Sequence, residues 1–188
     1  MRFDDYYMNF AYLSEKWLAD YLSRRFSSSQ NSDWHEQIED ERRHTLACEA
    51  ALNLKKVLPI VHDTNFSLQV GLYYKSGLIG DPEHFSEEEV RALCFLVERR
   101  ALGLYRFYLR HGSDPTYKAV TKAIIKDEMG HSKIHARRTC ETYQSLIASE
   151  RELFSGLTAT YGSEGMTSLR FWQDFFADRL ELNVHAMA

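Results

Sequence analysis

Glycine and proline, the residues that most often interrupt regular structure, are scarce in this sequence. The 188 residues include nine glycines and three prolines, and neither type occurs in the first 58 residues. Average usage puts the two together near ~12% of a chain, about twice the fraction found here. An all-β sandwich or barrel needs a turn every ~8–12 residues. The scarcity therefore excludes all-β folds, collagen-like repeats and Pro/Gly-rich disorder, and it favours an all-α chain.

Cysteine is also rare, and its placement excludes most cysteine chemistry. The three residues, Cys48, Cys94 and Cys140, form no C-x-x-C pair. An odd number without that spacing argues against a disulfide framework and against a cysteine-based zinc or rubredoxin-like site. We expect the three thiols to be reduced and to pack as small apolar side chains.

The sequence has neither an excess of basic residues nor a long apolar run. Lys and Arg number 23 against 27 Asp and Glu, which argues against binding to the phosphate backbone of a nucleic acid. The longest apolar run, residues 92–97, is far shorter than the ~20 residues that span a bilayer. The first seven residues lack the apolar core of a secretory signal. We therefore expect a cytoplasmic protein with no membrane partner, and the charge balance disfavours a nucleic-acid partner without excluding a local basic patch.

Apolar residues recur at helical spacing in four long segments that polar or Gly/Pro-containing breaks separate. The segments are 4–26, 33–58, 86–110 and 115–143, and the last can extend to residue 154. Asp33 and Ser86 are expected to cap the second and third helices. Shorter helices are expected at 65–75 and 167–182.

Four helices of about 35–40 Å with one long connection between the second and third predict a four-helix bundle with a crossover connection. The last amphipathic segment adds a further C-terminal helix. We expect one domain over residues 1–188, with the core bundle at about 4–145 and a C-terminal helical extension at 146–188.

Two of the predicted helices carry the same Asp-Glu-x-x-His motif. The copies are Asp40-Glu41-Arg42-Arg43-His44 and Asp127-Glu128-Met129-Gly130-His131. Residues three apart lie on one face of a helix, so each motif projects a carboxylate and an imidazole together. One such pair is a weak signal, whereas two on separate helices indicate a metal site.

A dinuclear site in a bundle core takes one further Glu from each of the remaining two helices. The interior of each of those segments contains one Glu among apolar neighbours, Glu15 in the first and Glu98 in the third. Four buried carboxylates need cations nearby, and two divalent ions supply the matching charge. Oxygen and imidazole ligands suit iron or manganese, and zinc can mimic them.

With these residues in place, the sequence resembles the ferritin-like di-iron carboxylate superfamily over about residues 6–143. That superfamily includes bacterioferritins, rubrerythrins, acyl-carrier desaturases, aldehyde-deformylating oxygenases and bacterial multicomponent monooxygenases. The resemblance implies two iron ions, or manganese or a mixed pair, held by Glu15, Glu41, His44, Glu98, Glu128 and His131. It also implies that Asp40 and Asp127 each hold the imidazole of the opposite motif, which fixes its tautomer.

The sequence also departs from several members of the superfamily. The missing C-x-x-C module excludes a complete rubrerythrin, and the second Glu-x-x-His argues against a plain ferritin. Ala101 and Leu102 stand where several hydroxylases and desaturases carry a threonine, which argues against a proton relay of that kind.

The resemblance implies an enzyme, a non-haem di-iron oxidase or oxygenase that activates O2 and oxidises a small organic substrate. Its electrons would come from a separate donor protein, because no flavin, nicotinamide or Fe–S motif is visible. Two alternatives stay open: an iron-handling or peroxide-detoxifying protein like bacterioferritin or rubrerythrin, and a tRNA hydroxylase of the same superfamily. A homodimer is compatible with the apolar C-terminal segment.

A few further residues have open roles. His135 is either an additional ligand or a core histidine, and Tyr105 either lines the site or packs in the core. Arg42 and Arg43 are expected on a solvated face, with one of them in reach of a site acid. Gly103 and Gly130 lie inside predicted helices, which indicates either a close helix crossing or room for a pocket.

Overall fold

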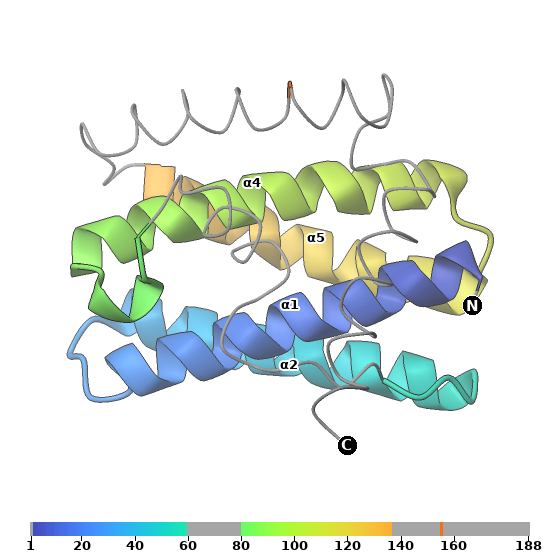
Figure 1. The fold of residues 1–188 in the computed structure, drawn as a ribbon, viewed down its shortest axis with the longest axis horizontal. Helices are drawn as coiled ribbons and strands as arrows, with labels where there is room; N and C mark the ends of the chain where they lie inside the picture. Colours follow the sequence, from blue (N-terminus) through green and yellow to red (C-terminus); the bar gives the residue numbers. More distant parts are fainter. Residues whose placement is uncertain (1, 60–79, 137–154, 156–188) are drawn as a thin grey trace, which may run out of the picture.

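The computed structural model describes residues 2–59, 80–136 and 155, and this part of the chain is helical. Four long helices lie side by side (Figure 1) and are, in chain order, α1 (Phe3–Phe26), α2 (Ser32–Leu54), α4 (Glu87–His111) and α5 (Pro115–Ala136). A short 3₁₀ turn, η1 (Pro82–His84), precedes α4. The helices expected at 65–75 and 167–182, the C-terminal extension and the fourth segment beyond residue 136 lie outside the described residues.

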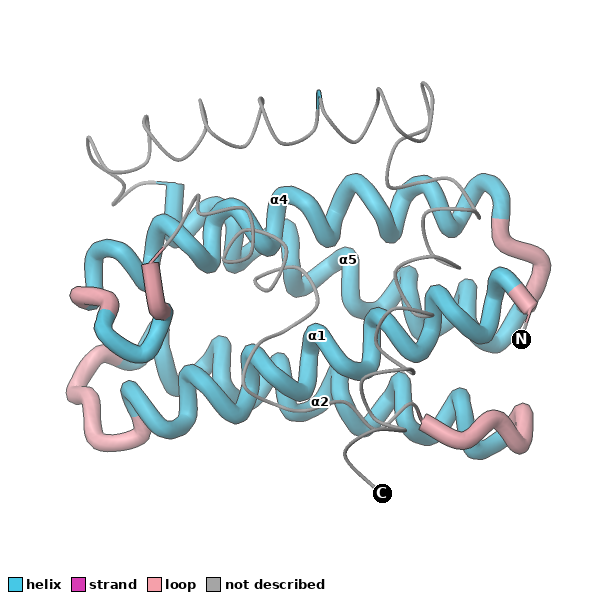
Figure 2. Tube along the Cα trace, in the orientation of Figure 1, coloured by secondary structure: helices cyan, strands magenta, loops and turns pink. Residues whose placement is uncertain are grey.

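The helix directions fit a long connection between the second and third helices. α1 and α2 are antiparallel, as are α4 and α5, whereas α2 and α4 run the same way (Figure 1). α2 therefore ends, and α4 begins, at opposite ends of the bundle. Within the described ranges the loops lie only at these two ends (Figure 2), so the middle of the bundle is formed by helices alone.

The start of α4 follows the expected capping pattern. The Ser86 hydroxyl accepts a hydrogen bond from the Glu89 amide at 3.2 Å, and the Glu89 carboxylate accepts one from the Ser86 amide at 2.7 Å. This reciprocal capping box satisfies two amides that the helix leaves unpaired. The prediction for Ser86 is confirmed.

Both ends of α2 differ from the prediction. The cap is Asn31, whose side chain accepts a hydrogen bond from the Asp33 amide. The helix ends at Leu54 rather than residue 58, because Lys56 adopts a left-handed conformation with φ of 55°. The Val57 amide then donates back to the Leu52 carbonyl at 3.0 Å, which closes a Schellman motif. Glycine usually occupies such a position, so the sequence carried no stop signal there.

The core of the described helices consists of two apolar clusters separated by a polar layer. One cluster contains Tyr7, Phe10, Leu52 and Tyr105, and the other contains Trp17, Leu22, Trp34 and Val97, among other members. Each of the four helices passes through the layer between the clusters, and six acidic or imidazole side chains are buried there. None of the described helices combines the length and the apolar character that crossing a membrane requires.

At one end of the bundle, Asp4 ties α1 to the loop between α4 and α5. Its carboxylate accepts hydrogen bonds from the Tyr108 hydroxyl, the Ser113 amide and hydroxyl, and the Asp114 amide, at 2.5 to 3.2 Å. Burial alone would raise the pKa of Asp4, but the bonds from Ser113, Tyr108 and Asp114 outweigh it and lower the pKa from 3.8 to about 2. The ionised form of Asp4 therefore stabilises the fold.

We expect Asp4→Asn to lower the free energy of unfolding by roughly 1–3 kcal/mol at neutral pH, since several donors lose a charged acceptor. The folded pKa lies below the unfolded one, so the contribution of Asp4 is present above pH 3.8 and is lost as pH falls towards about 2. Urea unfolding of both chains across this range measures the effect. Equal stability at neutral pH, or a gap that does not narrow in acid, would contradict this role of Asp4.

Candidate metal centre

The polar layer brings together all six side chains that the sequence predicts as metal ligands. α1 and α4 contribute one carboxylate each, and α2 and α5 contribute a carboxylate and an imidazole each. None of the six is more than 4% exposed: Glu15, Glu41, His44, Glu98, Glu128 and His131. Helical spacing explains this placement, because the two members of each Glu-x-x-His motif share the inward face of their helix.

The six side chains form two groups that can each hold a metal ion. One group contains Glu15, Glu41, His44 and Glu128, and the other contains Glu41, Glu98, Glu128 and His131, with ligand atoms within 4.8 Å of one another in each. Glu41 and Glu128 belong to both groups. A carboxylate has two oxygens, so these two residues can bridge a pair of ions.

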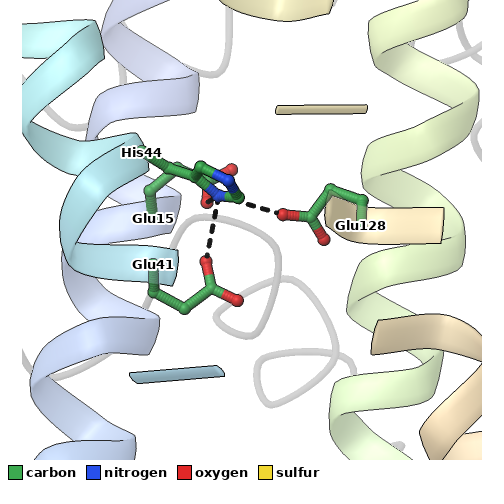
Figure 3. A group of neighbouring side chains, drawn as sticks. All are labelled: Glu15, Glu41, His44 and Glu128. Atoms are coloured by element: carbon green, nitrogen blue, oxygen red, sulfur yellow. Dashed lines mark hydrogen bonds and ion pairs between the residues drawn. The ribbon is translucent and has the colours of Figure 1, made fainter. Parts of the chain in front are cut away.

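The distances to the imidazoles assign one oxygen of each shared carboxylate to each group. Nδ1 of His44 lies 3.1 Å from Oε2 of Glu15, 3.2 Å from Oε1 of Glu128 and 3.7 Å from Oε2 of Glu41. Figure 3 shows these three carboxylates converging on the His44 ring from three helices. They form the first group.

The second group repeats this arrangement with the other oxygens. Nδ1 of His131 lies 3.6 Å from Oε1 of Glu41 and 3.9 Å from Oε2 of Glu128. Oε1 of Glu98, the carboxylate that belongs to this group alone, lies 3.7 Å from Nδ1 of His131. Glu41 and Glu128 therefore present one oxygen to each imidazole, as a pair of bridging carboxylates does.

The Nε2 atom of each imidazole is hydrogen-bonded to an aspartate of the opposite motif. Nε2 of His44 lies 3.1 Å from Oδ2 of Asp127, and Nε2 of His131 lies 3.1 Å from Oδ2 of Asp40. With Nε2 donating to an aspartate, Nδ1 of each ring is available to a metal. The guanidinium of Arg43 contacts both aspartates, at 2.6 Å from Asp40 and 2.9 Å from Asp127.

The chemistry of the buried atoms fits a cation. Within the described part of the chain, four buried atoms of the site make no hydrogen bond: Oε2 of Glu41, Oε2 of Glu98, Oε1 of Glu128 and Nδ1 of His131. Leaving such polar atoms unpaired in a buried site is costly. Bound metal ions would satisfy all of them at once.

The electrostatics of the buried groups also favour positive charge at this site. Burial, together with the neighbouring Glu15 and Glu98, raises the pKa of Glu41 well above its ordinary value. Burial alone would lower the pKa of His44, but the neighbouring carboxylates of Glu15 and Glu41 raise it to about 11. The site thus attracts cations, because it holds protons far more tightly than these groups do in water.

Sequence reasoning missed Gln37, which lies one turn before Glu41. Its Nε2 donates to Oε1 of Glu98 at 2.7 Å, and its Oε1 accepts a hydrogen bond from Nε2 of His135 at 3.0 Å. His135 is buried but lies outside both ligand groups that the described residues form. The sequence did not predict this role, because a glutamine can lie on any face of a helix and does not by itself indicate a contact to a metal ligand.

We expect Gln37→Leu to weaken metal binding by about 10–100-fold at the group containing Glu98 and His131. Leucine keeps the volume of the side chain but cannot orient the Glu98 carboxylate. Calorimetric titration with Mn²⁺ would then resolve one weakened and one normal site. Arg42→Leu is the matched control, because Arg42 lies on the same helix and pairs with exposed Glu39. Unchanged affinity in Gln37→Leu would argue against this role.

Tyr105 lies against the other unshared carboxylate. Its hydroxyl donates a hydrogen bond to Oε1 of Glu15, and burial raises the pKa of the phenol well above its ordinary value. The phenol therefore stays protonated and remains a donor. Tyr105 and Gln37 thus hold Glu15 and Glu98 in corresponding ways, one in each group.

A small cavity borders four carboxylates of the site. Its volume is about 10 Å³, roughly the space that one water needs. The remaining lining comes from α1 and α4, namely Ser14, Leu18, Val97 and Ala101. Gly103 and Gly130 do not line it. Both are exposed, and nothing among the described residues lies within 4 Å of a Cβ built at either, so neither marks a close crossing between two described helices.

Comparisons of the chain with protein-family models, curated proteins and solved structures found no match. Its function must therefore be inferred from the chemistry of the site.

Proposed function

We propose that the protein is a non-haem di-iron oxidoreductase that reacts with O2 at a carboxylate-bridged dinuclear site and oxidises a small substrate. The observation that carries the proposal is the membership of Glu41 and Glu128 in both ligand groups. Glu41 and Glu128 each present one oxygen to His44 and the other to His131. This division is expected of a site for two ions and not of a site for one. The fold proposed with it is a ferritin-like bundle.

The charge and type of the ligands favour two divalent redox metals. Four carboxylates carry four negative charges, which two divalent ions balance. Imidazole and carboxylate ligands suit iron and manganese, so a manganese or mixed pair is compatible with the same residues. Bound iron would supply one-electron redox chemistry and a place for a small oxidant to react.

The protein residues have separate tasks in this proposal. Glu41 and Glu128 would hold both ions, while the imidazoles of His44 and His131 would each hold one. Asp127 and Asp40 keep those imidazoles in the tautomer that leaves Nδ1 for the metal. The apolar clusters on either side keep bulk water away, which strengthens the electrostatic interactions at the site. A separate protein would supply the electrons.

One observation favours a second candidate, an iron-oxidising or peroxide-reducing protein. The cavity beside the carboxylates has about 10 Å³, roughly the space of one water, which suits a very small oxidant rather than an organic substrate. In this version Fe²⁺ or a reduced donor protein is itself the substrate. The dinuclear site and its ligands are the same as in the first candidate.

Addition of Fe²⁺ to metal-free protein under air tests the proposal and separates the candidates. We expect about two irons bound per chain, with O2 consumed as they are bound. Continued turnover of excess Fe²⁺ together with a cage-sized particle in size-exclusion chromatography would favour iron handling. A monomer or dimer that stops after the two bound irons would favour the oxidase or oxygenase. Failure to bind iron and to consume O2 would overturn both.

A further inference from the structure

Among the described residues that line the cavity beside the carboxylates, Ser14 is the one neutral polar residue. It lies on α1 directly before Glu15, and it is 5% exposed. The other neutral lining residues, Leu18, Val97 and Ala101, are apolar. Among the residues that the structure describes, the Ser14 hydroxyl has no hydrogen-bond partner.

Other serine and threonine hydroxyls inside the described helices hydrogen-bond to a backbone carbonyl, which the Ser14 hydroxyl does not. The hydroxyls of Ser23, Thr45 and Thr121 each donate to the carbonyl four residues earlier, at 2.6 to 2.8 Å. This backbone bond is the ordinary solution for a serine or threonine inside a helix. The Ser14 side chain does not use it, although a buried hydroxyl without a partner is unfavourable.

The cavity limits what the partner can be. Its volume of about 10 Å³ fits a water or a molecule of similar size. The apolar side chains of Leu18, Val97 and Ala101 offer no second hydrogen bond, so the occupant needs only one donor besides the metal ligands. A small oxidant such as O2 or hydrogen peroxide meets both conditions, whereas an organic substrate does not fit.

We propose that this cavity binds the small oxidant and that the Ser14 hydroxyl donates a hydrogen bond to it. The inference rests on the proposed dinuclear centre, because the same cavity is also lined by Glu15, Glu41, Glu98 and Glu128. Ser14 is then a ligand-binding residue supplied by α1. Its unpaired state reflects a partner that arrives with the reaction.

Ser14→Ala separates ligand binding from a structural role, because the two predict opposite changes. Metal-free Ser14→Ala loses an unpaired buried hydroxyl, so we expect its unfolding temperature to rise by about 2–4 °C. The iron-loaded variant should keep its two irons but bind azide, used as a small anionic probe, about tenfold more weakly than wild type. Spectrophotometric titration of the azide complex gives this affinity.

Ser23→Ala is the matched control, since its hydroxyl lies on the same helix and is bonded to the Ala19 carbonyl. We expect no change in its azide affinity. Equal azide affinity in wild type and Ser14→Ala would overturn the role of Ser14 while leaving the metal centre intact. A lower unfolding temperature or a loss of iron in Ser14→Ala would also overturn it, because either result makes Ser14 structural. Failure of the wild-type protein to bind iron would instead overturn the proposed function.

Discussion

Glu128→Ala is expected to empty both metal positions, so that metal content falls from about two ions per chain to well below one. Glu128 offers Oε1 to the His44 group and Oε2 to the His131 group. Its removal therefore takes a ligand from each ion and also leaves the pair with one bridge instead of two. Elemental analysis of purified protein after metal loading and dialysis measures the effect.

Two matched variants make this result specific. Glu15 belongs to one group only, so Glu15→Ala should lose one ion and keep the other. Glu39 is an exposed carboxylate on α2, and Glu39→Ala should keep both. Full metal retention in Glu128→Ala would show that Glu128 is not a ligand.

The second large effect concerns thermal stability, which should depend strongly on bound metal. An ion present at a thousand times its dissociation constant stabilises a protein by about 4.1 kcal/mol. Two such ions correspond to a rise in unfolding temperature on the order of 15–30 °C for a chain of this size. Differential scanning calorimetry of metal-loaded and chelator-treated protein measures the shift.

In the absence of metal, we expect the Glu128→Ala variant to be more stable than wild type. Without cations, buried carboxylates repel one another and raise each other's pKa, as Glu15 and Glu98 do for Glu41. Removing one carboxylate relieves part of this repulsion, so metal-free Glu128→Ala should unfold above metal-free wild type. It should gain little when metal is added. The same large metal-induced shift in both chains would mean that the ions stabilise the protein elsewhere.

The sequence was most informative where helix geometry alone fixes side-chain positions. An i, i+3 pair lies on one face whatever surrounds the helix, so the two Glu-x-x-His motifs could be aligned in advance. Glu15 and Glu98 followed because each was an acidic residue among apolar neighbours on an interior face. The approximate extent of α1 and α4 followed from the same periodicity.

What the sequence could not indicate depends on contacts between helices. Gln37 and Ser14 have ordinary residue types, and only the packing of α1, α2 and α4 places them at the carboxylates. Arg42 and Arg43 were expected on a solvated face with one of them in reach of a site acid, but only the packing of α2 against α5 shows that Arg43 is that residue and that it joins Asp40 to Asp127. Lys56 ends α2 in a left-handed conformation that glycine usually adopts, so the residue type did not predict the end of the helix.

The arrangement of the site has an internal symmetry that the repeated motifs suggest. His44 is held by Asp127 of the other motif, and His131 is held by Asp40 in return. Tyr105 orients Glu15 in one group, while Gln37 orients Glu98 in the other. The outer partners thus differ although the ligands correspond, which gives the two positions different surroundings and predicts unequal metal affinities.

The most direct test of the dinuclear centre is a crystal structure of manganese- or iron-loaded protein with anomalous diffraction data. We predict two anomalous peaks roughly 3.5–4 Å apart, both bridged by Glu41 and Glu128, with Nδ1 of His44 on one ion and Nδ1 of His131 on the other. A fully loaded crystal with no peak between these residues, or with a single peak, would contradict the assignment.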